Sequence, residues 1–234
     1  MSKPLDYGAA LAEIDTIHAT KPRKTHPMWR ALMNGELSRG QVTTFLRQFG
    51  VIPLYNHNYH GPLYVSCPDP VWRKRMAEVV YEEGTGGLYA EGVPHYQLYL
   101  NVGKAFGVSA DEMYATKYCG GALAFRGWFS NMCRKNFVEG YAALSLGAEA
   151  QVPGVSGRVS EAMVKHYGLT PQQAAFYTVH EVADADHSGG SREFLETFCR
   201  TGPDLRRAIE AVRGAVEISW LFYEDIHQLV RAQA

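Results

Sequence analysis

The sequence predicts an all-helical fold, and three observations support that prediction. Apolar residues recur at three- and four-residue spacing along most of the 234 residues, which is the pattern of helices with one buried face. The alternation of apolar and polar residues that marks a half-buried strand is nearly absent. Glycine and proline interrupt the periodic stretches at short intervals, as the turns of a bundle do. We therefore expect an up-and-down bundle of about seven to eight helices.

The expected helices can be followed along the chain by this periodicity. In the first half they cover residues 5–18, 28–33, 41–54, 71–83 and 96–106. Ser109 is followed three residues later by Glu112, which is the pattern of a capping box and marks a helix start. Thr170 and Gln173, with a proline between them, mark another. The segment 204–230 has a charged face and an apolar face, so we expect a long packing helix there.

The composition limits the classes of protein to which this chain can belong. A chain of 234 residues with 46% hydrophobic side chains can bury one sizeable core, so residues 1–234 are expected to form a single domain. The formal net charge of -1 provides no basic surface for nucleic acid or an anionic membrane, and we expect a small-molecule substrate. The sequence has no apolar run typical of a signal peptide or a membrane span, which predicts a cytoplasmic location. The four cysteines form no CxxC pair and are expected to be reduced thiols.

The motif that carries chemistry is HEVADADH, residues 180–187. On a helix the positions i, i+4 and i+7 share one face, so the side chains of His180, Asp184 and His187 are expected to converge. Two imidazoles and one carboxylate suit iron, manganese or zinc. A solvated polar face is the alternative, but the alanines on both sides of Asp184 favour close approach of neighbouring helices over exposure to water.

Further metal ligands must come from other helices, because one helix supplies too few donors for two metal ions. Glu149 lies in a stretch of Ala, Leu and Gly, where an unpaired carboxylate is costly. Glu82 and Glu83 close one expected helix, and His95 opens the next. Adjacent helical residues point about 100° apart, so only one of the two glutamates faces the interior easily. Glu82 is the first choice as a ligand, and Glu83 is held in reserve.

Together these motifs resemble a known family. The paired glutamates with a following His and LY, then AEAQVP, then YGLTPQQAAFYTVHEVADADH are similar to the heme-oxygenase-like di-iron oxidases of the thiaminase (TenA) and pyrroloquinoline-quinone synthase (PqqC) superfamily. Within it they most resemble the chlamydial death-domain-associating protein (CADD)-like family, as does SCPDPVWRKRMAEVVYEEG. The resemblance covers most of residues 25–188. It implies a heme-oxygenase-like bundle and six metal ligands: Glu82, His95, Glu149, His180, Asp184 and His187.

The resemblance also implies an activity. It is that of a homodimeric oxidase with two iron ions, or manganese or zinc in their place, and with dioxygen as co-substrate. Such an enzyme would oxidise or oxidatively cleave a small carboxylate-bearing metabolite, for example an amino acid. Two features depart from the family pattern: the connection from the paired glutamates to His95 is longer, and residues 153–163 lack the lysine associated there with p-aminobenzoate formation. The second departure weakens p-aminobenzoate synthesis as the specific activity.

Other interpretations remain open. In a metal-free PqqC-like oxidase, HEVADADH would supply acid and base groups. A TenA-like thiaminase would need an activated thiol, for which Cys133 is the candidate. A module that only binds partners would leave the polar motif unexplained. His18 is a weak candidate for a heme ligand, and His57 and His60 are interpreted as half-buried packing residues rather than as lining of a substrate pocket.

Overall fold

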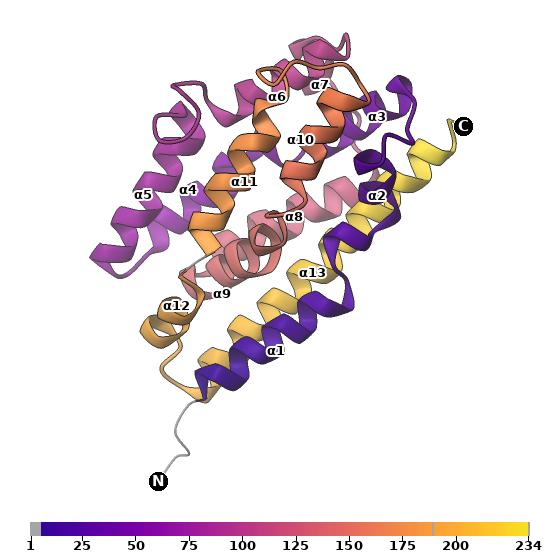
Figure 1. Ribbon diagram of the computed structural model, residues 1–234. Helices are drawn as coiled ribbons and strands as arrows, with labels where there is room; N and C mark the ends of the chain where they lie inside the picture. Colours follow the sequence, from indigo (N-terminus) through magenta and orange to yellow (C-terminus); the bar gives the residue numbers. More distant parts are fainter. Residues whose placement is uncertain (1–5, 189, 234) are drawn as a thin grey trace.

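The computed structural model describes residues 6–188 and 190–233, and for residues 184–188 it describes the backbone alone. Within these ranges the chain is helical and contains no strand (Figure 1). The α-helices are α1 (Tyr7–Thr20), α2 (Pro27–Met33), α3 (Arg39–Phe49), α4 (His57–Ser66), α5 (Pro70–Thr85), α6 (His95–Ala105), α7 (Ala110–Tyr114), α8 (Gly120–Lys135), α9 (Phe137–Tyr141), α10 (Ser156–Lys165), α11 (Ala175–Ser188), α12 (Ser191–Phe198) and α13 (Gly202–Arg231). The 3-10 helices are η1 (Arg23–Thr25), η2 (Pro53–Tyr55) and η4 (Glu149–Gln151), and η3 (Ala142–Ala148) is a π-helix. The all-α prediction is confirmed, but the described residues form more helices than the seven to eight expected.

Helix α13 is the main packing element of the bundle. It spans 30 residues and packs on η3, α8, α3 and α1, and Figure 1 shows α1 running beside it. Thr201 begins it with a capping box in which the Thr201 hydroxyl accepts from the backbone N–H of Asp204. Val212, Val216 and Phe222 are buried along its inner face, as the amphipathic pattern of 204–230 predicts.

No helix in the described part of the chain is long and apolar enough to cross a bilayer.

The expected helix 41–54 is too long at its C-terminal end. Helix α3 stops at Phe49, and after a turn the chain enters η2 at Pro53. In a continued helix the ring of Pro53 would collide with the carbonyl of Phe49, four residues earlier, and the missing N–H would break the hydrogen-bond ladder. The resulting bend leads the chain into α4, which carries His60 into the interior.

Helices α5 and α6 are joined by a tight connection that brings their ends together. Asp69 caps α5 by accepting from two backbone N–H groups, and Gly86 ends it with a φ of 67°. A Cβ at Gly86 would lie 2.1 Å from the carbonyl oxygen of Val93, so only glycine fits this approach. Helix α6 then begins at His95, as expected. The last turn of α5 and the first residue of α6 therefore lie next to each other.

The segment that carries Glu149 departs from regular α-helix. Helix α9 continues into the π-helix η3, which ends at Ala148, and Glu149 begins the 3-10 helix η4. π-helical turns are rare and are found most often at functional sites. The wider turn changes the direction in which the following residues leave the helix axis, and Glu149 is the first of them.

Candidate metal centre

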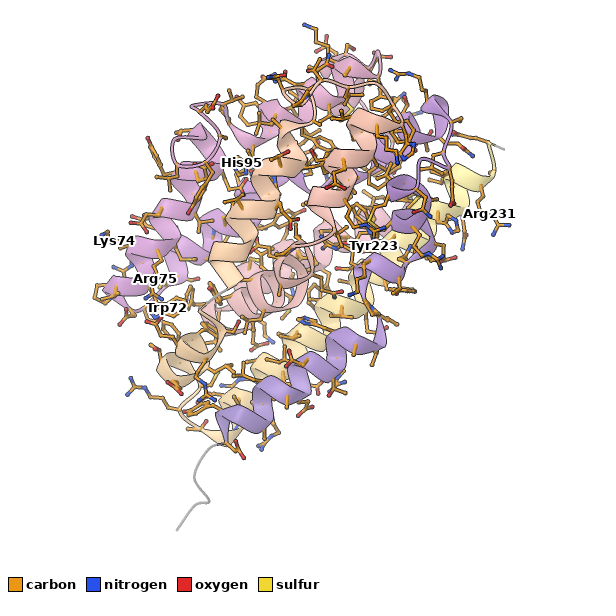
Figure 2. The ribbon with its side chains drawn as sticks, in the orientation of Figure 1. Trp72, Lys74, Arg75, His95, Tyr223 and Arg231 are labelled. Atoms are coloured by element: carbon orange, nitrogen blue, oxygen red, sulfur yellow. The ribbon has the colours of Figure 1, made fainter. Side chains whose placement is uncertain are left out.

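Glu83, His95 and His180 form a cluster of metal-ligating groups between α5, α6 and α11. One ligand atom from each lies within 4.8 Å of the others. The ring centroids of His95 and His180 are 4.7 Å apart, and the side chain of Glu83 is 12% exposed. Two consecutive helices and the distant α11 therefore place two imidazoles and a carboxylate around one point, and Figure 2 shows His95 in this region of the bundle.

His95 stands between the two adjacent glutamates. Its Nε2 lies 2.9 Å from Oε1 of Glu82, and its Nδ1 lies 3.1 Å from Oε2 of Glu83. The contact with Glu82 is a hydrogen bond, whereas the buried Nδ1 has no partner in hydrogen-bond geometry. Nε2–H donates to Glu82, so Nδ1 is the nitrogen that faces Glu83 and His180, and it offers a lone pair to a metal once it has lost its proton. Oε2 of Glu83 also accepts a hydrogen bond from Asn56.

The protonation of this pair reflects its two carboxylates. Burial opposes ionisation of Glu83, but the contact with His95 and its charge hold the pKa of Glu83 well below its usual range. Burial likewise opposes a charged His95, but Glu83 and then Glu82 raise the pKa of His95 above its ordinary value. A proton on His95 thus compensates the buried carboxylates, which is the charge that a bound cation would supply.

His180 is oriented by its own helix. Its Nδ1–H donates to the carbonyl of Phe176, one turn earlier, at 2.8 Å. That bond fixes the tautomer and leaves Nε2 available as a ligand. Burial lowers the pKa of His180 to about 4, so the imidazole is neutral near pH 7 and can bind a metal without first losing a proton.

Glu149 and His60 form a second polar group beside the cluster. Nε2 of His60 lies 2.9 Å from Oε1 of Glu149, and the hydroxyl of Ser145 donates to Oε2 of Glu149 at 3.0 Å. Burial opposes a charged His60, but the hydrogen bond and charge of Glu149 raise the pKa of His60. Glu83 also acts electrostatically on His60, so the imidazole lies within range of both acidic residues.

Two cavities meet at the His60–Glu149 pair. The inner cavity has a volume of about 90 Å³, and Glu83 and His180 also line it. The outer cavity has a volume of about 460 Å³ and is lined beyond the pair by Trp72 and Arg75, which Figure 2 shows on α5. The pair therefore lies between the inner cavity beside the cluster and a larger cavity.

The donor set fits iron. Two neutral imidazole nitrogens and one carboxylate are the ligands found around non-heme ferrous centres, although zinc and manganese accept them too. The unpartnered Nδ1 of His95 and the Nε2 of His180 are the atoms that such an ion would take up. Glu82 then completes a carboxylate–histidine–metal arrangement in which the outer carboxylate orients the ligand.

The six residues expected as ligands fall into three groups. His95 and His180 lie in the cluster, and Glu149 lines the same inner cavity. Glu82 contacts His95 from the side opposite Glu83, the residue held in reserve, whose carboxylate is the one in the cluster. Asp184 and His187 are on α11 with His180, but their side chains lie outside the described residues.

Sequence reasoning missed two residues of this site. His60 was expected to be a packing residue, but it hydrogen-bonds Glu149 and lines both cavities. Asn56 was not predicted as a site residue, but its side-chain amide donates a hydrogen bond to Glu83. The available signal was their spacing, since residues four apart lie on one face of a helical turn. Polar pairs at that spacing are common on surfaces, so the pattern alone does not distinguish an interior pair.

The environment of Cys133 disfavours thiol chemistry. The side chain is fully buried, and burial followed by the charge of Glu149 raises the pKa of Cys133 to about 12. A nucleophilic cysteine needs a thiolate near neutral pH, which an electropositive environment provides and this one does not.

Solved structures superpose on this chain over nearly its whole length, and one of them is described as having a heme-oxygenase-like fold. A CADD-like protein of unknown function from Nostoc punctiforme superposes with a TM-score of 0.74 at 13% identity, covering 96% of this chain and 98% of its own. A TenA homologue from Pseudomonas syringae gives 0.72 at 13% identity, covering 97% and 98%. A heme-oxygenase-like domain from Shewanella denitrificans gives 0.71 at 16% identity, covering 97% and 94%. The fold is therefore heme-oxygenase-like.

Curated relatives include proteins named 4-aminobenzoate synthase. The one from Chlamydia muridarum is 25% identical over 221 residues, covering 92% of this chain and 89% of the relative. The one from Nitrosomonas europaea is 25% identical over 231 residues, covering 92% and 90%. A model of a family described as iron-containing redox enzymes matches residues 43–220. That match spans most of the chain, and the protein therefore belongs to this family of iron-containing redox enzymes.

Proposed function

We propose that this protein is a non-heme di-iron oxidase that uses dioxygen to oxidise a small carboxylate-bearing metabolite. The observation that carries the proposal is the buried cluster of Glu83, His95 and His180, which opens onto the same inner cavity as Glu149. A first iron ion would be held by the cluster. A second would be held by Glu149 with Asp184 and His187 of α11, since facing helices supply the ligands of dimetal sites in helical bundles.

The charge of the site supports two divalent ions. Glu82, Glu83, Glu149 and Asp184 together carry four negative charges when ionised, which equals the charge of two ferrous ions. Burying several carboxylates without cations would be costly. With only one ferrous ion bound, two of the four negative charges could be compensated only by protonated histidines.

The bound iron would supply the electrons and the open coordination positions that dioxygen activation needs. The chain's own residues perform the other tasks. Glu82 holds His95 in the tautomer that presents Nδ1 to the metal, and the carbonyl of Phe176 does the same for Nε2 of His180. The mostly apolar walls of the inner cavity, which include Trp29 and Phe176, would disfavour water beside the bound iron.

We propose no specific product. The curated relatives are named 4-aminobenzoate synthase, and the same oxidase chemistry is what we infer for this chain. Residues 153–163 contain Arg158 but no lysine, which leaves the chain without the lysine associated with that product. The substrate class we infer is a compact organic acid, including amino acids.

The test is to load the purified protein with ferrous ion without oxygen, measure bound iron, and record the optical spectrum after oxygen is admitted. We expect about two irons per chain and a transient visible band. His180→Ala should lose iron while the far-ultraviolet circular dichroism stays helical. Absence of stoichiometric iron from both the wild type and His180→Ala would contradict the proposal and favour the metal-free oxidase.

A further inference from the structure

The inner cavity contains a buried cation that the metal centre does not use. Arg23 lines this cavity together with Trp29, Phe176 and Tyr177, and its relative exposure is 9%. The aromatic walls suit the carbon skeleton of an apolar ligand. A guanidinium at such a wall is the unusual feature, since arginine is almost never buried without a partner.

Several contacts hold the side chain of Arg23 in place, but none of them neutralises its positive charge. One terminal nitrogen donates to the carbonyl of Ala148 at 3.0 Å, and the guanidinium carbon lies 5.7 Å from the ring of Trp29 and 5.5 Å from that of Tyr223. These contacts are with a neutral carbonyl and two aromatic faces. No carboxylate of the described residues forms an ion pair with Arg23.

The backbone around Arg23 ties the guanidinium to the metal centre. The backbone N–H of Arg23 donates to the side chain of Gln151 at 2.8 Å. Ala148 and Gln151 flank Glu149 in η3 and η4, so Arg23 is fixed to the same segment that carries this acidic residue. A ligand bound by Arg23 would therefore be positioned relative to the metal site by a short and rigid connection.

The charges around the inner cavity indicate which kind of partner Arg23 lacks. If the four carboxylates of the site balance two ferrous ions, Arg23 remains as an uncompensated positive charge in the inner cavity. A guanidinium has five N–H donors arranged to bind a carboxylate with two parallel hydrogen bonds, and the Ala148 carbonyl uses one of them. A substrate carboxylate would satisfy both the charge and the remaining donors.

We propose that Arg23 is the residue that selects the substrate, by binding the carboxylate of a compact organic acid whose carbon skeleton fills the aromatic inner cavity. The proposal rests on the proposed function and names the substrate class for the same site. At about 90 Å³ the cavity is small for a ligand site, which suits a short-chain acid better than a long acyl chain.

Binding of propionate and propionamide tests the proposal, because the two probes match in size and differ in charge. The full-length protein is titrated with each probe in its ferrous form without oxygen and in its metal-free form, and tryptophan fluorescence is followed because Trp29 lines the cavity. We expect the wild type to prefer the acid on the order of ten-fold. Arg23→Gln should abolish that preference, and Arg23→Lys should keep most of it.

Arg126→Gln is the matched control, since Arg126 also lies over two aromatic rings, those of Tyr55 and Tyr118, but does not line the inner cavity. It should keep the wild-type preference. The proposal fails if Arg23→Gln still prefers the acid, or if the wild type binds neither probe. Metal content is measured on the same samples, so failure of the di-iron assignment is recorded separately from failure of the Arg23 assignment.

Discussion

At the scale of single residues, the candidate site depends on which nitrogen of His95 faces which glutamate. Glu82 is fully buried and binds Nε2, so it is the carboxylate that sets the orientation of the ring. Glu83 approaches Nδ1 and belongs to the cluster with His180. In the proposed metal centre the two neighbouring glutamates would therefore have different roles, Glu82 orienting a ligand and Glu83 serving as one.

Isosteric substitutions of these two residues distinguish the roles. Glu83→Gln removes a charged donor from the cluster and should lower the number of metal ions bound per chain. Glu82→Gln should keep that number but weaken metal affinity by about 10- to 100-fold, as loss of an orienting partner does. Metal stoichiometry and competition with a chelator measure both effects. The opposite ranking would make Glu82 the ligand.

The sequence predicted some of these residues and not others for a physical reason. His180 and His95 were expected because a motif and a helix start are local patterns. The choice between Glu82 and Glu83 depends on how α5 is rotated relative to α6 and α11, which is decided by packing between helices. No local sequence pattern determines how α5 is rotated relative to the other two helices.

At the scale of elements, the π-helix η3 is the feature that places Glu149. It packs against α13 more closely than a side chain would allow, since a Cβ at Gly147 would lie 2.6 Å from the Cβ of Ala215. The periodicity of the sequence does not distinguish a π-turn from an α-turn, because both bury the same small residues. Glu149 was expected on an apolar helix, and the change of helix type was not foreseen.

Substitution of Gly147 tests how tightly this element is held. Gly147→Ala should lower the free energy of unfolding by about 1–3 kcal/mol, because the new methyl group overpacks the contact with α13. Gly127→Ala on α8 is the control: nothing lies within 4 Å of its added Cβ, and it should stabilise by about 0.5–1 kcal/mol. Urea denaturation of both variants measures the difference. Equal effects would show that η3 can move away from α13.

At the scale of the whole molecule, the helical class was predictable and the number of helices was not. Apolar periodicity and capping residues such as Ser109 and Thr170 are local and survive in any packing. Short helices also arise where packing interrupts a periodic stretch, as at the change from α9 to η3. Such interruptions depend on the tertiary environment, so a count of periodic segments underestimates them.

Global stability should depend on pH through buried histidines, of which His26 is the clearest case. Its Nδ1 accepts the backbone N–H of Met28 at the start of α2, and its side chain is fully buried. Burial lowers the pKa of His26 to about 4, although Glu224, 3.5 Å from Nε2, opposes that effect. The unfolded chain takes up a proton near pH 6.5, which the folded chain does only near pH 4. The contribution of His26 to the free energy of unfolding should therefore be constant above pH 6.5. Below pH 6.5 it should fall by at most about 1.4 kcal/mol per pH unit until pH 4.

His26→Asn isolates this contribution, because asparagine can still cap α2 but does not titrate. Urea denaturation of the metal-free variant and wild type, from pH 8 to pH 4, should give parallel stabilities above pH 6.5 and a shallower decline for the variant below it. Part of the decline should remain, since burial also lowers the pKa values of His18 and His180. A constant offset between the two proteins at every pH would mean that His26 does not contribute to acid destabilisation. The decline would then have to come from the site histidines, and bound metal, which competes with protons for His180, would be expected to suppress it.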